Sequence, residues 1–211
     1  TAFEGMREPY HQEDKLEGWR NGKTGYPFVD ACMRSLIQTG YLNFRMRAML
    51  VSFAAYHLFL DWRKLNPILA ALFTDYEPGI HISQLQMQSG VTGINAIRIY
   101  NPIKQGIDHD PHGDFIREFV PELRHLSNEE IHLPNNIYAE PIVELKSSLK
   151  FARDAMAQVR KSDDFKTIAK GVYNKLGSRK RNSSEQKNRQ PTLLTQKQLM
   201  SFKTKNCISR E

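Results

Sequence analysis

Cysteine is scarce in this sequence and follows no metal-binding or disulfide pattern. Only Cys32 and Cys207 occur among the 211 residues, and they form no CxxC pair. Neither a zinc site nor a disulfide framework is therefore indicated. A reducing cytosol is the expected compartment, so the expected localisation is cytoplasmic.

Long apolar runs are also missing. The most apolar stretch, residues 48–60, contains His57 and is flanked by Arg47 and Asp61, so no membrane span is expected. No GxGxxG, P-loop or GxSxG motif occurs, which removes the usual sequence signals for nucleotide loops and serine hydrolases. The sequence begins at Thr1 and shows no signal peptide, and we expect a fragment or a processed chain.

The positive charge is concentrated at one end of the chain. The net charge is +7, and residues 179–211 hold nine Lys or Arg against two Asp or Glu. The preceding residues hold 21 of each sign and are neutral, so the basic balance does not indicate a DNA-binding groove in the folded part. We expect residues 1–177 to form the folded domain and residues 178–211 a basic, disordered tail that can attract phosphate non-specifically.

Helical patterns dominate the folded part, and the expected fold class is all-α. Pro27 suits a first helical position and Gly40 a position just past a helix end, with apolar residues at helical spacing between them. A second helix is predicted over residues 43–63, and its almost uniformly apolar middle is typical of a buried central helix.

The remaining elements are predicted from capping residues and spacing. They are a short helix over 66–73 entered through Pro67, an irregular segment over 75–101, a short helix opened by Asp110-Pro111 with Pro in its first turn, and helices over 139–160 and 163–175.

Arg45 and Arg47 stand at the start of the buried helix, where positive charge opposes the helix dipole. Arg47 shares a face with apolar residues, so we expect it to be partly buried and paired with an acid. The candidate partners are Asp75 and Glu77. A structural ion pair that closes a loop on a helix would explain the same pattern.

Residues 108–114 begin like a calcium loop but do not satisfy its requirements. Pro111 follows the third position, and the twelfth is Phe119 rather than a bidentate Glu. Helix capping in a solvated loop is the favoured interpretation, and no metal site is predicted. The residues alone indicate an all-α domain with a buried arginine–acid cluster.

A longer pattern points to a known family. Residues 19–34 read WRNGKTGYPFVDACMR and resemble the photolyase and cryptochrome pattern W-x-x-G-x-T-G-x-P-x-V-D-A-x-M-R. The similarity continues through residues 39–47, 61–63, 98–105 and 110–123, and covers roughly residues 19–177. The resemblance implies the C-terminal portion of the helical FAD-binding domain of this family.

The resemblance also implies a cofactor, FAD, and the residues that contact it. Asp75, Tyr76 and Glu77 match the family's acidic flavin-contacting segment. Arg47 matches the arginine that pairs with the first of these acids near the flavin ring. Phe44 matches the residue that faces flavin N5.

Electron transfer and DNA contacts are implied in the same way. Trp62 matches the middle tryptophan of the family's electron-transfer chain and, with Phe44, is a candidate catalytic residue. Arg45 and Gln105 match positions that contact DNA, and Met87 is a candidate wall against which a flipped base would stack.

Three departures from the family pattern bear on function. Dimer-repairing photolyases usually have Asn where Phe44 stands, and Phe cannot hydrogen-bond to N5. The inner tryptophan and the substrate-stacking tryptophan fall on Leu85 and Met87, so the chain of three tryptophans is interrupted. Tyr41, Tyr56 or Tyr76 is a candidate substitute.

The resemblance leaves several functions open. The first is light-driven repair of pyrimidine dimers in DNA, by electron transfer from reduced FAD. The second is a cryptochrome-type blue-light receptor, in which flavin photoreduction is passed to a signalling protein without repair. The third is a flavin-free structural relic. No membrane partner is expected.

Overall fold

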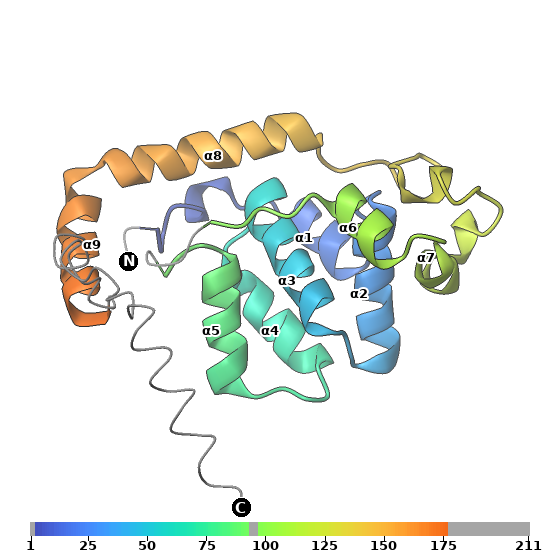
Figure 1. Cartoon of the computed structure of the whole chain (residues 1–211), viewed down its shortest axis with the longest axis horizontal. Coiled ribbons are helices and arrows are strands. Elements are labelled where there is room, and N and C mark those ends of the chain that lie inside the picture. The colour runs from blue at the N-terminus through green and yellow to red at the C-terminus, as the bar shows by residue number, and fades with distance from the viewer. Residues whose placement is uncertain (1–2, 93–96, 177–211) are drawn as a thin grey trace, which may run out of the picture. The chain divides into compact units, whose positions relative to one another are not determined.

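The computed structural model describes residues 3–92 and 97–176 of the chain. The chain divides into two units, Thr1–Lys175 and Leu176–Glu211. Its described residues form helices joined by turns, with no strand among them (Figure 1). The all-α prediction is confirmed. The predicted tail lies outside the described residues.

The described helices follow one another along the chain with short connections. They are α1 (Glu13–Arg20), α2 (Pro27–Thr39), α3 (Phe44–Ser52), α4 (Trp62–Leu72), α5 (Pro78–Gln88), α6 (Pro102–His109), α7 (Asp114–Phe119), α8 (Leu145–Lys161) and α9 (Asp163–Leu176), with single turns at Glu8–Tyr10, Phe53–His57, Pro121–Leu123 and Glu130–His132. No described helix has the length and apolar character that a membrane crossing requires.

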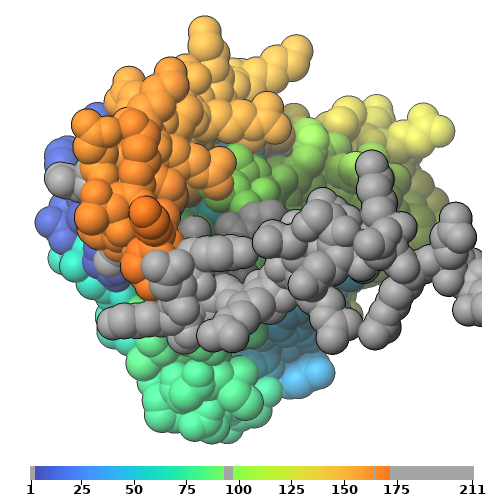
Figure 2. Space-filling model, turned by 60° about the vertical axis from the view of Figure 1, so that its left-hand side comes forward, coloured from blue at the N-terminus to red at the C-terminus, as the bar shows by residue number. Residues whose placement is uncertain are grey.

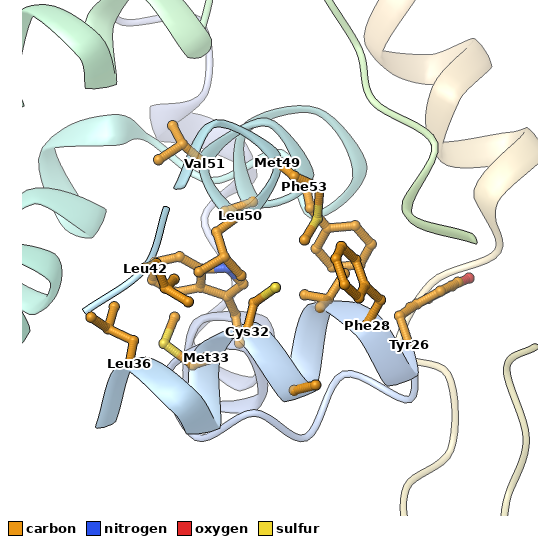
Figure 3. Packing of buried hydrophobic residues seen from close by; sticks show 14 of the residues in the cluster. Tyr26, Phe28, Cys32, Met33, Leu36, Leu42, Met49, Leu50, Val51 and Phe53 are labelled. Atoms are coloured by element: carbon orange, nitrogen blue, oxygen red, sulfur yellow. The ribbon is translucent and has the colours of Figure 1, made fainter. Parts of the chain in front are cut away.

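α2 forms as predicted and is a main wall of the core. It begins at Pro27 and is ended by Gly40, whose φ of 71° is a left-handed conformation that glycine adopts without strain. Phe28, Cys32 and Leu36 on its inner face pack against α3 (Figure 3). α2 and α3 therefore enclose the centre of the domain.

The predicted single helix over residues 43–63 is wrong. α3 ends at Ser52, a π-helical turn covers Phe53–His57, and the chain leaves helical geometry before α4. Phe59 has a φ of +57°, which no helix accommodates. The side chain of Asp61 then accepts from the backbone N–H of Arg63 (2.8 Å) and caps a new helix.

The predicted start of the helix near Pro67 and the predicted irregular segment over residues 75–101 are both wrong. α4 begins at Trp62, so Pro67 lies inside a helix that was expected to start beside it. The segment expected to be irregular contains α5, because Pro78 occupies its first position and the carboxylate of Glu77 accepts from Ile80 N–H (2.6 Å).

Asp110 caps as predicted, but the helix starts later than expected. Its carboxylate accepts from the N–H groups of Phe115 (3.1 Å) and Ile116 (2.9 Å). Pro111 lies in the turn before α7 rather than in its first turn, and Gly113 with a φ of +72° makes the entry. The helices predicted over 139–160 and 163–175 are confirmed as α8 and α9, with α8 starting after Glu144.

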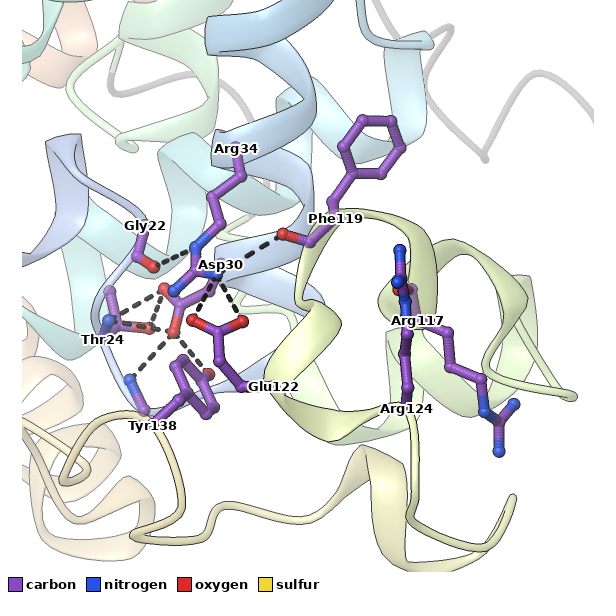
Figure 4. A network of polar contacts seen from close by, with 10 residues as sticks. Gly22, Thr24, Asp30, Arg34, Arg117, Phe119, Glu122, Arg124 and Tyr138 are labelled. Atoms are coloured by element: carbon purple, nitrogen blue, oxygen red, sulfur yellow. Dashed lines mark hydrogen bonds and ion pairs between the residues drawn. The ribbon is translucent and has the colours of Figure 1, made fainter.

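A buried carboxylate fastens α2 to the loops around it (Figure 4). Asp30 is fully buried and accepts from Thr24 N–H (2.8 Å), Gly25 N–H (2.9 Å) and the hydroxyl of Tyr138 (2.6 Å). Burial raises the pKa of Asp30, while these hydrogen bonds oppose the rise. Because Thr24 and Gly25 lie in the turn before α2 and Tyr138 lies more than 100 residues later, the carboxylate links two segments that are distant in sequence.

Candidate functional site

A cavity of about 170 Å³ lies between α3, α4 and α5. Its floor is apolar and includes Leu50, Val51, Leu69 and Phe73. The residues that the family resemblance assigns to the flavin all line it: Phe44, Arg47, Asp75, Tyr76 and Glu77. Residues from α3 and from the turn before α5 are thus brought together by the fold.

Arg47 is placed by the cap of α3. The side chain of Asn43 accepts from Met46 N–H (3.0 Å) and starts the helix, so that Arg47 falls one turn inside it. Its Nε donates to the Leu42 carbonyl (2.7 Å), and its guanidinium carbon lies 4.1 Å from the centroid of the Phe73 ring. The side chain is partly buried, as predicted, with an exposed fraction of 27%.

The acid partner of Arg47 is Asp75 rather than Glu77. Nη2 of Arg47 donates to Oδ2 of Asp75 at 2.7 Å. This hydrogen bond and the charge of the guanidinium lower the pKa of the Asp75 carboxyl against a smaller opposing effect of burial. Glu77 instead caps α5, because its carboxylate accepts a hydrogen bond from the backbone N–H of Ile80.

Sequence reasoning missed two polar residues of the cavity, His81 and Gln84. Each has a buried atom without a hydrogen-bond partner among the described residues, Nε2 of His81 and Oε1 of Gln84. The His81 ring meets the rings of Phe73 and Tyr76 edge to face, with centroids 5.9 and 5.1 Å apart. Burial lowers the pKa of His81, and the charge of Arg47 adds to the effect.

The sequence spacing of His81 and Gln84 indicates a shared helical face once α5 is known to be a helix. Glu77, His81, Gln84 and Gln88 are separated by four, three and four residues, which places them on one helical face. The expectation of an irregular segment concealed this spacing. The polar face of α5 is therefore directed into the cavity.

Trp62 lies at the start of α4 and is not among the described residues that line the cavity. Its indole N–H donates to the carboxylate of Glu4 (3.1 Å). Leu85, at the position matched to the inner tryptophan, does line the cavity and is 2% exposed. The cavity wall thus has an aliphatic side chain at the position where the family pattern has a tryptophan.

The residues matched to DNA contacts lie outside the cavity lining. Arg45 is exposed on the first turn of α3, Met87 is half-buried on α5, and Gln105 is half-buried on α6. The Oε1 atom of Gln105 is buried without a partner among the described residues. The structure therefore does not bring these three side chains into one pocket.

Comparison with known proteins decides the family. A family model of the FAD binding domain of DNA photolyase matches residues 1–158. The chain belongs to the photolyase/cryptochrome family. The family's cofactor is FAD.

Family members with different names resemble the chain to a similar degree. The deoxyribodipyrimidine photo-lyase of Alkalihalophilus pseudofirmus is 36% identical over 152 residues, which cover 70% of this chain and 32% of that protein. Cryptochrome-2 of Arabidopsis thaliana is 34% identical over 166 residues, covering 71% and 27%. The crystal structure of a class III photolyase from Agrobacterium tumefaciens has a TM-score of 0.68 and 32% identity, covering 76% and 37%. The chain thus spans about a third of the length of these photolyase/cryptochrome relatives.

The cavity residues fit part of an FAD molecule. An apolar floor suits a planar ring, Arg47 offers a cation, Asp75 an acceptor, and His81 and Gln84 carry buried atoms that await partners. The volume of about 170 Å³ is below the roughly 300–1,000 Å³ of typical ligand pockets. A cavity of this size can therefore accommodate only one portion of such a cofactor.

Proposed function

We propose that this chain forms the flavin-ring side of an FAD site, and that the protein repairs pyrimidine dimers in DNA by light-driven electron transfer. The observation that supports this most directly is the convergence of Phe44, Arg47, Asp75, Tyr76 and Glu77 on one cavity. FAD, when bound in its reduced form, supplies the light-excited electron donor.

The charged residues of the cavity position and polarise the ring. Arg47 would stabilise negative charge on a bound flavin ring, because its guanidinium is held at the cavity by Leu42 and Asp75. Asp75 stays ionised beside Arg47 and would accept a hydrogen bond from an N–H of a bound flavin ring. His81 is neutral near pH 7 and can hold a proton at Nδ1 or Nε2.

The rim of the cavity supports an aromatic substrate such as a flipped base. Phe44 and Tyr76 line the cavity with exposed fractions of 61% and 39%. Tyr41, 58% exposed, lies next to the cavity residue Arg47, with 5.6 Å between its ring centroid and the guanidinium carbon. Such rings stack on bases at a gain of roughly 1–3 kcal/mol each. Arg45 beside Phe44 supplies a cation for the phosphate backbone, and Met87 and Gln105 remain candidate DNA contacts.

The interrupted tryptophan chain bears on how the flavin would be reduced. With Leu85 in the cavity wall and Trp62 outside the lining, rapid photoreduction through tryptophans is not expected. A blue-light receptor is the second candidate function, because relatives called cryptochromes match this chain as well as relatives called photolyases.

The test measures flavin retention and then repair, in this chain and in any longer protein that contains it. Asp75→Asn should lower the flavin absorbance per protein after dialysis, whereas Asp163→Asn in an exposed ion pair should not. Retention unchanged by Asp75→Asn would remove Asp75 from the site. With chemically reduced FAD, light should split dimers in DNA. Retained flavin without splitting would favour the receptor, and no flavin in any form would favour the structural relic.

A further inference from the structure

A second depression lies away from the flavin cavity, between α8 and the extended segment that leads into α6. Its volume is about 830 Å³, and it shares no lining residue with the cavity between α3, α4 and α5. In Figure 1 the segment of residues 97–101 passes beneath α8, and Figure 2 shows that side chains of α8 and α9 protrude from the surface. We call this depression the α8 groove.

Positive charge dominates the lining of the α8 groove. Arg98 comes from the extended segment, and Arg153, Arg160 and Lys161 come from α8. All four side chains are exposed, and no carboxylate is among the described lining residues.

These cations also lack an acid partner among the described residues. None of the four forms an ion pair with another described residue, whereas Arg34, Arg47 and Arg63 each pair with a carboxylate. Unpaired cations facing a common depression repel one another, and that repulsion is relieved when an anion binds.

The spacing of the charges favours an extended anion over a single one. Arg153 and Arg160 are seven residues apart, which is two helical turns or about 10 Å along α8. Arg98 faces them from the opposite wall. A row of this length matches a chain of phosphates better than one phosphate group.

The floor of the groove is apolar and has one aromatic residue. Ile97, Ile99 and Met156 line it, together with Tyr100, which is half-buried and also packs against the core. Single-stranded nucleic acids are bound where a basic groove follows the backbone and apolar or aromatic surface accepts bases and sugars. Three of the four cations are arginines, whose planar fork matches phosphate oxygens.

We propose that the α8 groove binds the backbone of single-stranded nucleic acid, independently of flavin and of damaged bases. Helix stability explains only part of the charge, since Arg160 and Lys161 complement the dipole at the end of α8 but Arg153 and Arg98 do not. Residues 179–211 are excluded as the occupant by charge, because they carry nine Lys or Arg against two Asp or Glu.

The experiment measures binding of an undamaged, fluorescently labelled oligothymidine to the whole chain in the dark. The double variant Arg153→Glu/Arg160→Glu should bind at least about tenfold more weakly, with a salt dependence reduced by about two phosphate contacts. The matched control is Lys146→Glu/Lys150→Glu, which makes the same charge change on exposed residues of α8 outside the groove lining. The control should change affinity less than about twofold.

Three outcomes would overturn the proposal. Equal losses in both double variants would mean that net charge alone attracts the oligonucleotide. Equal binding of a duplex of the same length would contradict the single-strand assignment, and displacement by polyglutamate at equal charge concentration would contradict a nucleic-acid site. Circular dichroism checks that each variant folds. Asp75→Asn should leave this binding intact, so failure of the flavin site and failure of the groove are distinguishable.

Discussion

His81 shows how the surroundings of a single side chain set its charge. The ring lies against Phe73 and Tyr76, and burial is the main cause that lowers its pKa, with the charge of Arg47 next. Asp75 opposes the effect but is already engaged by Arg47. The folded protein therefore keeps His81 neutral at pH values where an unfolded chain begins to protonate it.

This difference predicts a pH dependence of stability. An unfolded His titrates near about pH 6.5, and below that value the unfolded state binds more protons than the folded state. The free energy of unfolding should therefore fall as the pH drops below about 6.5. Replacing His81 by Asn should make this fall smaller, as measured by urea unfolding at pH 7.5 and pH 5.5.

The control for this prediction is His109→Asn, on an exposed position of α6. It should retain the full pH dependence of the parent chain. His57 contributes in the same direction, since burial lowers its pKa as well. A His81→Asn variant with an unchanged slope would mean that the imidazole is solvated and does not face the cavity.

At the scale of elements, α5 is defined by the residues at its two ends. Pro78 and Glu77 start it, and Gly90 with a φ of +72° turns the chain just after it. A Cβ atom at Gly90 would lie 2.3 Å from the hydroxyl of Tyr56. The turn thus packs directly on the buried π-helical segment Phe53–His57, which leaves no room for a side chain.

Gly90→Ala should therefore destabilise the domain. The left-handed conformation costs about 1 kcal/mol for a residue with a Cβ atom, and overpacking against Tyr56 adds roughly 1–3 kcal/mol. The matched control is Gly171→Ala in α9, where nothing lies within 4 Å. That change should raise stability by up to about 1 kcal/mol.

Urea unfolding of both glycine variants checks this prediction. A loss at Gly90 no larger than the change at Gly171 would show that Tyr56 does not lie under the turn. Because α5 presents His81, Gln84 and Leu85 to the cavity, a shift of its end should also lower flavin retention.

For the whole molecule, Arg7 joins segments that are far apart in sequence. It is 1% exposed, and it donates from Nε to the Ala55 carbonyl and from Nη2 to the Ser89 carbonyl, each at 2.8 Å. Its guanidinium carbon lies 5.3 Å from the ring centroids of both Tyr56 and Phe59. Carbonyl oxygens and ring faces thus stabilise a buried cation that has no ion pair among the described residues.

Arg7→Ala should destabilise the domain strongly. It leaves the buried carbonyls of Ala55 and Ser89 without their donors, at a cost of roughly 1–3 kcal/mol each. The expected loss in the free energy of unfolding is therefore about 2–6 kcal/mol, measured by urea unfolding. Arg20→Ala, on an exposed position at the end of α1, should change it by less than about 0.5 kcal/mol. A similar small effect at Arg7 would contradict its linking role.

The sequence by itself determined those features that depend on neighbouring residues or on a single physical requirement, such as an acid partner for a buried cation. Pro27 and Gly40 define α2 because each restricts the backbone at its own position. Arg47 on an apolar face required an acid, and the sequence offered Asp75 and Glu77, of which the structure pairs Asp75 with it. The ordered motifs of residues 19–34 predicted the family for the same reason, since they need no knowledge of contacts.

Only the tertiary structure decided where the central helix breaks and which side chains face one another. A segment buried on all sides carries no periodicity that marks its end, so the π-helical turn and Phe59 could not be predicted from it. The α8 groove joins Arg98 to residues of a helix more than 50 positions later. Such pairs are set by packing between distant segments, on which local spacing carries no information.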